Sequence, residues 1–262
     1  MTTLLSLSAP DSRRTGIASR ARDVVKIYGQ GDAAVHALAG ANLEVHAGQF
    51  TAVMGPSGSG KSTLMHALAG LDTIDSGQVL LGTTDLSSLG ERDRTLLRRQ
   101  RIGFIFQSFN LVPSLTAAEN IVLPLTLAGV KPDPDWLQSL VDTLGLRNRL
   151  GHRPSELSGG QQQRVAAARA LVARPEIVFA DEPTGNLDSR HGQALLDFMA
   201  DTTRTFGQTI VMVTHDPKAA ACTDRVVFLA DGQVVDEVAE PAVETILARM
   251  AHLDGPSASV GE

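Results

Sequence analysis

Several features are scarce in this chain, and each scarcity excludes a class of protein. Its 262 residues include a single cysteine, Cys222, so an internal disulfide is impossible and a reducing compartment such as the cytoplasm is expected. No basic residue adjoins Cys222 to activate the thiol, which favours a packing role over a catalytic one. Aromatic residues make up only 4%, yet 43% of the residues are hydrophobic, enough to bury the core of one large domain.

Clustered positive charge and long apolar runs are also missing. The formal net charge is −6, and because nucleic-acid binding relies on grouped lysines and arginines, we expect no nucleic-acid partner. The charged stretch Glu91–Arg101 is interpreted as the solvated face of a helix. The apolar stretch Ile121–Val130 is interrupted by Pro124 and Gly129 and is too short to span a bilayer, so no membrane anchor is expected.

Apolar runs of strand length alternate with stretches of helical spacing along most of the chain. The run Phe50–Met54 ends at a glycine-rich loop, after which Lys61–Leu68 continues with helical spacing. Later strand-length runs are separated by helical stretches: the runs are Ile102–Phe106, Ile177–Ala180, Ile210–Val213 and Val226–Leu229, and the helices include Gln161–Ala173 and Gly192–Thr203. This order predicts an α/β fold with a mostly parallel sheet and helices on both faces.

Two segments depart from this order. Alternation in Ala21–Ile27 and Ala41–Val45, with turn residues Gly29–Asp32 between them, predicts a small antiparallel β layer near the N-terminus. Between Thr116 and Ser155 the apolar residues fall at helical spacing, with Pro132 and Pro134 marking a break, which predicts an inserted helical lobe. The predicted division is a disordered tail 1–18, one domain 19–254 with its lobe at about 108–158, and a disordered tail 255–262.

A phosphate-binding loop stands between the predicted strand and helix. The segment Gly55-Pro56-Ser57-Gly58-Ser59-Gly60-Lys61-Ser62 has the two glycines, the lysine and the hydroxyl that this motif requires. Its glycines let backbone N–H groups converge on phosphate oxygens, and Lys61 adds a positive charge at the helix N-terminus. With Thr63, these residues are the predicted phosphate contacts, and the Ser62 hydroxyl is a predicted Mg²⁺ ligand.

Two neighbouring acids end a buried strand. A phosphate-loop enzyme needs a carboxylate there to hold Mg²⁺ or its water shell, and Asp181 follows the apolar run Ile177–Ala180. The adjacent Glu182 should point differently because the strand ends there, which suits a general base for an attacking water. A solvated acidic pair before Pro183 is the alternative, and the upstream phosphate loop disfavours it.

A third motif, Leu157-Ser158-Gly159-Gly160-Gln161, precedes a long predicted helix. Ser158 is placed as its N-cap, and the bare glycine amides behind it form a second anion-binding helix terminus. Together the three motifs resemble the ABC ATPase family over roughly Arg20–Ala251. The resemblance implies that family's fold, ATP and Mg²⁺ as ligands, and ATP hydrolysis. It also implies an ATP-bound homodimer in which the signature Leu157, Ser158, Gly159, Gly160 and Gln161 of one subunit covers the nucleotide on its partner's phosphate loop.

The resemblance assigns further roles outside the three motifs. It implies that Tyr28 stacks on adenine with Val35 packed nearby, and that Asp188 contacts the opposite subunit. It also implies that His215 touches the γ-phosphate.

Gln107, directly after a predicted strand, matches the loop glutamine that approaches Mg²⁺ and the attacking water. The implied catalytic set is therefore Glu182, His215 and Gln107, and the implied metal set is Ser62, Gln107 and Asp181.

Two longer stretches indicate a subfamily. Residues 109–120 and 181–188 are similar to the ATPases of macrolide-exporter and lipoprotein-releasing systems, whose partners are FtsX-like or MacB-like membrane permeases. The resemblance implies a peripheral ATPase on the cytoplasmic face of the membrane that drives export or extraction of a lipoprotein, drug, peptide or similar substrate. The alternative is an FtsE-like cell-envelope signalling complex. A nucleic-acid or translation protein of the family is disfavoured, because those carry two cassettes or long coiled coils.

Overall fold

The computed structural model describes residues 16–253. The strands are β1 (Ile17–Tyr28), β2 (Val35–His46), β3 (Phe50–Met54), β4 (Ser76–Leu81), β5 (Thr84–Asp85), β6 (Ile102–Phe106), β7 (Ile177–Asp181), β8 (Thr209–Val213), β9 (Arg225–Ala230) and β10 (Gln233–Ala239). The α-helices are α1 (Lys61–Leu68), α2 (Glu91–Arg101), α3 (Ala117–Ala128), α4 (Pro134–Thr143), α5 (Gly159–Leu171), α6 (Ser189–Phe206), α7 (Pro217–Ala220) and α8 (Val243–Leu253). Short 3-10 turns cover Gly31–Ala33, Arg147–Arg149 and Pro154–Glu156.

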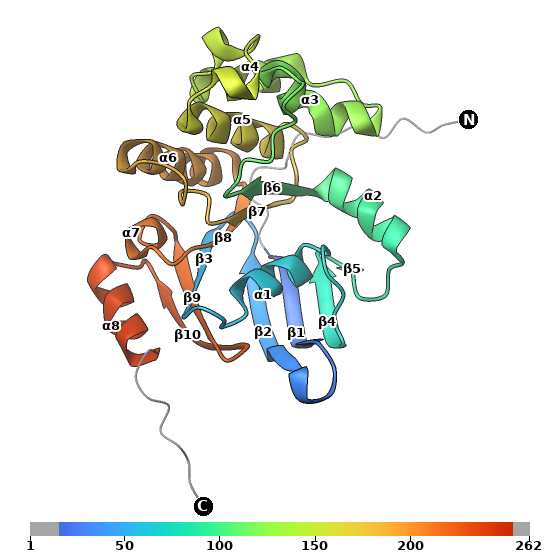
Figure 1. The fold of residues 1–262 in the computed structure, drawn as a ribbon, viewed down its shortest axis with the longest axis vertical. Helices are drawn as coiled ribbons and strands as arrows, with labels where there is room; N and C mark the ends of the chain where they lie inside the picture. The colour runs from blue at the N-terminus through green and yellow to red at the C-terminus, as the bar shows by residue number, and fades with distance from the viewer. Residues whose placement is uncertain (1–15, 254–262) are drawn as a thin grey trace, which may run out of the picture.

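The strands form two sheets (Figure 1). The core sheet has the order β10-β9-β3-β8-β7-β6 and is parallel except for β10, which pairs antiparallel with β9. The second sheet, β2-β1-β4-β5, is antiparallel throughout. Figure 1 shows α1 beside this second sheet, and α3, α4 and α5 gathered in a lobe at the opposite end of the molecule. The predicted α/β fold with an antiparallel layer is therefore confirmed.

The core sheet is buried on both faces, and its side chains alternate between two apolar clusters. On β7, Val178 and Ala180 join the cluster that includes the helical lobe, whereas Ile177 and Phe179 join the cluster beneath α1 and the antiparallel sheet. Successive side chains of a strand point to opposite faces, so both faces must be covered when every residue is apolar. This burial holds the carboxyl ends of the strands in a fixed position.

Three local features differ from the sequence-based expectation. The strands β4, β5 and β10 were not predicted. The strands β5 and β10 lie at sheet edges, β4 pairs with the two-residue β5, and most residues of the three strands are exposed or only half-buried. The helix α3 continues through Pro124 and ends only where Gly129 adopts a left-handed φ of 69°. The predicted tail 1–18 is wrong at its end, because Ile17 and Ala18 belong to β1; residues 1–15 of that tail and the predicted tail 255–262 lie outside the described residues.

The predicted boundaries of β3, α1, α2 and β6 agree with the structure, whereas β1 and β2 extend beyond the predicted Ala21–Ile27 and Ala41–Val45. The helix α2 spans Glu91–Arg101 and none of its residues is buried, so the charged stretch is a solvated face. From residue 117 to residue 157 the chain contains helices and turns but no strand, as expected for the lobe. Between residues 16 and 253, none of the helices is at once long enough and apolar enough to cross a membrane.

The helical lobe is anchored by one buried amide. Asn120 of α3 is fully buried, and its side chain accepts from the Val112 backbone N–H at 2.8 Å. The same amide donates to the carbonyl oxygens of Val112, Leu115 and Thr116 at 3.1, 3.2 and 3.0 Å. One buried side chain therefore binds both a backbone donor and backbone acceptors of the segment between β6 and α3, and it is the side-chain partner of the Val112 N–H and the Leu115 carbonyl.

Replacing Asn120 by leucine should destabilise the protein by about 2–4 kcal/mol, because the Val112 N–H and the Leu115 carbonyl lose the partner that the buried amide provides while the volume is kept. Urea unfolding measures the change, and hydrogen exchange should show the loss of protection concentrated in residues 111–117. Asn148→Leu, at an exposed position, is the matched control and should change the stability by less than about 0.5 kcal/mol. Equal stability of the two variants would contradict the anchoring role.

Candidate functional site

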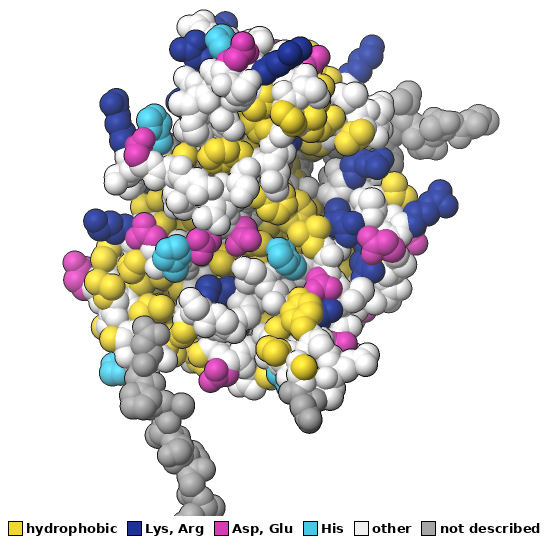
Figure 2. Space-filling view, viewed as in Figure 1, with side chains coloured by type: hydrophobic (Ala, Val, Ile, Leu, Met, Phe, Trp, Pro, Cys, Tyr) yellow, Lys and Arg dark blue, Asp and Glu magenta, His cyan; other side chains and the backbone are white. Residues whose placement is uncertain are grey.

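The predicted site residues meet at the carboxyl edge of the core sheet. In the register of the parallel strands, Val53 of β3 and Asp181 of β7 both lie opposite Val213 of β8, and Phe106 of β6 lies opposite Asp181. The residues that follow these four strand positions therefore emerge side by side. Figure 2 shows acidic and histidine side chains in a band across this face, between the helical lobe and the rest of the molecule.

The phosphate loop connects β3 to α1, with Gly60 as the N-cap of the helix. Gly60 has a φ of 98°, and a Cβ atom there would lie 2.2 Å from the carbonyl oxygen of Ala37, so only glycine fits. The Lys61 ammonium folds back over the loop and donates to the carbonyl oxygens of Gly55 and Pro56 at 2.9 and 2.6 Å. Burial lowers the pKa of Lys61, and the nearby charge of Glu182 opposes that effect.

The remaining loop residues surround this lysine. Ser57, Gly58 and Ser62 are exposed, Ser59 is buried, and Thr63 is half-buried in the first turn of α1. Exposed backbone amides next to a helix N-terminus leave a surface that an anion can reach.

The two carboxylates of the site differ in their surroundings. Asp181 is the last residue of β7, and burial raises its pKa above the ordinary aspartate value; His66 opposes this effect and the charge of Glu182 adds to it. Glu182 leaves the strand with a φ of 44°, a left-handed conformation that is rare for a residue other than glycine and is often kept at functional sites. Its backbone N–H still donates to the carbonyl of Val213 at 2.9 Å.

His215 reaches Glu182 from the neighbouring strand end. Its Nδ1 lies 2.8 Å from Oε1 of Glu182, although the two residues are 33 positions apart in the sequence. The His215 side chain is 71% exposed, whereas the Glu182 side chain is only 27% exposed. The contact orients the more enclosed carboxylate and leaves most of the imidazole open to solvent.

Gln107 follows β6 and lies against the segment that follows Glu182. A Cβ atom on Gly185 would come within 2.7 Å of the Gln107 Nε2, so the two residues touch. The side chain of Asn186 donates to the Gln107 carbonyl at 2.9 Å. The structure therefore brings Gln107, Glu182 and His215 together at one edge.

The signature residues lie at the start of α5. Ser158 is the N-cap and accepts from the Gln161 N–H at 3.3 Å, while the Gln161 side chain accepts from the Ser158 N–H at 3.0 Å, a reciprocal capping box. Leu157 is buried, and Gly159 lies near Phe109 and Asn186. Within residues 16–253, no hydrogen bond or ion pair joins residues 157–161 to the phosphate loop.

Asp188 caps the next helix, α6. Its carboxylate accepts from the backbone N–H groups of Arg190 and His191 at 3.1 and 3.0 Å and lies 2.7 Å from Nδ1 of His191. The backbone N–H of His191 and then its side chain lower the pKa of Asp188. The His191 ring packs against Gly160, where a Cβ would lie 2.7 Å away, so Asp188 is connected to the signature through one side chain.

Tyr28 and Val35 lie at the other end of the candidate site. They are opposite each other at the tip of the β1–β2 hairpin, and both are exposed. The Tyr28 hydroxyl donates to Asp72 at 2.6 Å, and the hydroxyl of Thr63 is close enough to affect the pKa of Tyr28. The tyrosine is therefore next to the helix that begins at the phosphate loop.

The sequence motifs do not include the residues that connect α5 to the loops after Glu182 and Gln107. Gln163 is fully buried, and its Nε2 donates to the carbonyl of Pro183 at 2.7 Å, which connects α5 to the loop after Glu182. Arg169 donates to the carbonyls of Asn110 and Phe109 at 2.6 and 2.8 Å and so fixes the loop after Gln107. The only sequence signal for Gln163 is that a polar residue falls on the buried face of α5. This signal does not reveal that its hydrogen-bond partner is the carbonyl of Pro183.

The donor set fits a magnesium ion. Among residues 16–253, no group of three or more histidine, cysteine, aspartate or glutamate side chains could hold a metal ion by itself. Magnesium binds phosphate-loop sites through one or two protein oxygens, nucleotide phosphates and water, so a full protein cage is not needed. Asp181, a partly enclosed carboxylate whose pKa is raised by burial, would gain from a cation beside it.

Comparison with known proteins agrees with this geometry. A family model described as "ABC transporter" matches residues 38–185. The lipoprotein-releasing system ATP-binding protein LolD of Pseudomonas fluorescens is 46% identical over 217 residues, covering 82% of this chain and 95% of that protein. The macrolide export ATP-binding/permease protein MacB of Marinobacter nauticus is 45% identical over 218 residues, but this chain spans only 34% of its length.

Solved structures lead to the same family. The dimeric ATP-binding cassette MJ0796 in a post-hydrolysis state bound to ADP and Pi is 37% identical, with a TM-score of 0.77, covering 86% of this chain and 99% of that one. A second dimeric structure of the same cassette is 38% identical with the same TM-score. Sequence family, relatives and fold agree, and the predicted resemblance is confirmed: the chain belongs to the ABC transporter family, as an ATP-binding cassette that hydrolyses ATP.

Proposed function

We propose that this chain holds ATP with Mg²⁺ on residues 55–63, uses Glu182 as the general base of hydrolysis, and drives a separate FtsX/MacB-like membrane permease. One observation carries the catalytic part. The parallel register places the residues after β3, β8, β7 and β6 next to one another, so Lys61, His215, Glu182 and Gln107 share one edge.

Each group has a distinct part in the proposed reaction. Lys61 replaces its contacts with the Gly55 and Pro56 carbonyls by contacts with the phosphates, whose charge it offsets. Ser62, Asp181 and Gln107 hold the magnesium ion directly or through its water shell. When bound, that ion supplies charge neutralisation at the β- and γ-phosphates.

Glu182 accepts the proton of the attacking water in this proposal. The carboxylate is enclosed, and the 2.8 Å contact with His215 fixes its orientation. A base must be within reach of its proton before its pKa matters, so a fixed carboxylate at the strand edge meets the first requirement. His215, which is mostly exposed, then remains available to contact the γ-phosphate.

A homodimer completes the site. The signature residues Leu157–Gln161 form an anion-binding helix terminus that faces no phosphate loop in their own chain. The two solved structures of the similar cassette MJ0796 are described as dimeric. In the proposed dimer the signature of each chain covers the nucleotide of the other, and Asp188 contacts the opposite subunit.

The relatives support the proposed permease and substrate class. The similar proteins are named for lipoprotein release and for macrolide export, so we propose a substrate of the lipoprotein, drug or peptide type and a position on the cytoplasmic face of the membrane. A groove between α2, β6, α3 and α5 offers a surface for the permease: it is lined by the apolar residues Ile102, Phe104 and Pro124 and by the basic residues Arg98 and Arg169. Phe106 and Asn110 also line it, so a bound segment would touch the loop of Gln107.

Changing Glu182 to glutamine should lower kcat by about 10²- to 10⁴-fold and leave ATP binding intact, because the side chain keeps its shape but loses its basicity. The stalled reaction should accumulate an ATP-bound dimer, visible by size-exclusion chromatography with Mg²⁺, and Ser158→Arg in the same chain should dissolve it. Glu244→Gln, an exposed position on α8, is the matched control and should turn over normally. Near-normal phosphate release from Glu182→Gln would move the base elsewhere.

Changing Asp181 to asparagine should act on the metal instead. The half-maximal Mg²⁺ concentration for nucleotide-dependent dimerisation should rise by about 10- to 100-fold, because one charged partner of the cation is lost. The titration is made in the Glu182→Gln background so that turnover does not interfere, with Asp93→Asn on the exposed face of α2 as the control. An unchanged Mg²⁺ requirement would refute the metal role of Asp181.

The permease proposal is tested by purifying the tagged full chain from native membranes and identifying integral membrane proteins that accompany it. A permease should copurify with the wild type. Ala173→Glu should release it, because the variant puts a charge into the groove, whereas Ala251→Glu on the exposed face of α8 should not. Recovery of the chain without any integral membrane protein would overturn the proposal.

A further inference from the structure

The proposed adenine contact, Tyr28, is poorly supported by apolar packing. Tyr28, at the end of β1, is 41% exposed, and the opposing Val35 is 62% exposed. An exposed ring retains much rotamer freedom, and fixing it on binding would reduce the affinity for the nucleotide. Contacts outside the apolar core must therefore hold the Tyr28 ring in place before the nucleotide base binds.

A buried lysine lies next to this ring. Lys26 is two residues before Tyr28 on β1, and although the pairing register with β2 shifts between Lys26 and Ile27, the two side chains lie next to each other. Lys26 is only 8% exposed, and its Nζ lies 5.0 Å from the centroid of the Tyr28 ring. An ammonium group is costly to bury unless it is paired, and a cation near an aromatic ring is attracted to its face.

Asp72 joins the two side chains. One oxygen, Oδ1, accepts from Lys26 Nζ at 3.0 Å and from the Thr73 N–H at 2.7 Å, and the other, Oδ2, accepts from the Tyr28 hydroxyl at 2.6 Å. Lys26 also donates to the Thr73 carbonyl at 2.6 Å. Burial by itself would raise the pKa of Asp72, but the hydrogen bonds from Tyr28 and Lys26 outweigh it and lower the pKa, which keeps the carboxylate charged.

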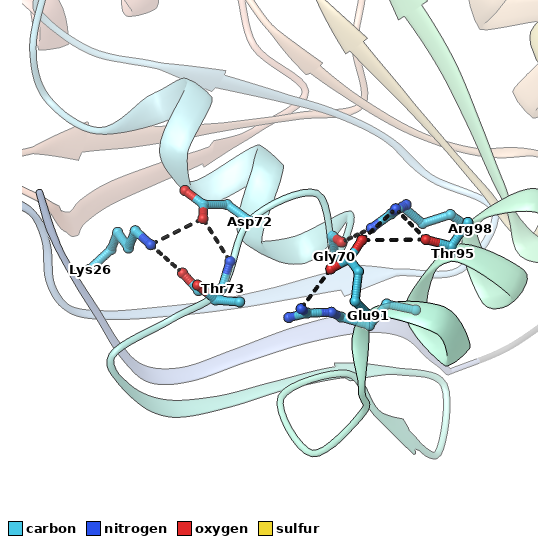
Figure 3. Close-up of polar contacts among 8 residues, drawn as sticks. Lys26, Gly70, Asp72, Thr73, Glu91, Thr95 and Arg98 are labelled. Carbon is cyan, nitrogen blue, oxygen red and sulfur yellow. Dashed lines mark hydrogen bonds and ion pairs between the residues drawn. The ribbon is translucent and has the colours of Figure 1, made fainter.

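The loop that carries Asp72 is held from both sides. It connects α1 to β4, and Figure 3 shows Lys26 bound at Asp72 and Thr73 and Arg98 of α2 bound at the Gly70 carbonyl. Arg98 is itself fixed by Thr95 at 2.9 Å and Glu91 at 3.3 Å. On the strand side, Asp75 accepts from the Ile27 N–H at 2.6 Å, directly before the tyrosine. Asp72 is therefore a fixed point and not a mobile loop residue.

We propose that Lys26 and Asp72 are positioning residues that fix the Tyr28 ring in the orientation that receives the nucleotide base. The inference rests on the proposed role of Tyr28. The Asp72 N–H also donates to the His66 carbonyl at 3.3 Å, so the same residue connects the ring to the helix that begins at Lys61. The base contact and the phosphate contact are thus held at a set distance by one segment.

The test compares two probes, ATP and inorganic tripolyphosphate, by calorimetry with Mg²⁺. Lys26→Met and Asp72→Asn should weaken ATP binding by about 5- to 20-fold, a part of the roughly 5- to 150-fold that base–aromatic stacking contributes. Neither variant should change the affinity for tripolyphosphate, which lacks a base. Lys26→Arg should recover most of the ATP affinity. Lys131→Met and Asp135→Asn, both exposed, are the matched controls.

A second readout observes the ring directly. Tyr28 is the only tyrosine in the sequence, so ¹³C labelling of the tyrosine ring yields signals from this residue alone. Saturating ATP should shift the wild-type signals through the ring current of the base, and Lys26→Met and Asp72→Asn should broaden the free signals and reduce the shift. Thermal unfolding of each variant accompanies the measurement.

The outcomes separate the two proposals. No shift in the wild-type protein would refute the role of Tyr28 and the inference with it. A wild-type shift with unchanged affinity and signals in both variants would overturn the positioning role and leave Tyr28 as the base contact. Equal losses for ATP and tripolyphosphate, with a lower melting temperature, would overturn it in favour of a purely structural role.

Discussion

The parallel pairing of β3, β8, β7 and β6 is the constraint on which the rest of the site depends. Strands of one direction end at the same edge, and the observed register aligns Val53, Val213 and Asp181 across three of them. Because an apolar cluster covers each face of this sheet, a one-residue shift of register would move side chains from one cluster into the other and disrupt the packing of both. The site is accordingly built from short loops on a rigid support.

Charge is concentrated where these loops meet. Lys61 is folded onto backbone carbonyls, and the two neighbouring acids Asp181 and Glu182 come next to each other in the chain, where the charge of Glu182 adds to the rise in the pKa of Asp181. Burial lowers the pKa of Lys61 and raises that of Asp181, which means that burial disfavours the charged form of each side chain. A bound group of opposite charge would stabilise each charged form. A nucleotide carrying a metal ion offers both signs at once, which explains why such a site suits this ligand.

The loops around the site are connected by polar side chains that do no chemistry themselves. Gln163 connects the signature helix to the loop after Glu182, Arg169 fixes the loop after Gln107, and His191 joins Asp188 to Gly160. Each is a short contact between segments far apart in the sequence. Residues 182–191 follow the core strand β7 and also contact the signature helix α5. A displacement of α5 relative to the core sheet would therefore change the contacts of these residues.

The sequence by itself determined the phosphate loop, the Asp181–Glu182 pair and the Ser158 cap, because glycine conformation, helix capping and strand periodicity are local properties. It also indicated β3, α1, α2 and β6 to the residue, since each begins or ends at an abrupt change of pattern. Only the tertiary structure decided the contacts of His215 with Glu182 and of Lys26 with Asp72, which join residues 33 and 46 positions apart. Such pairs depend on strand order and register, which arise from packing over the whole chain and leave no local pattern in the sequence.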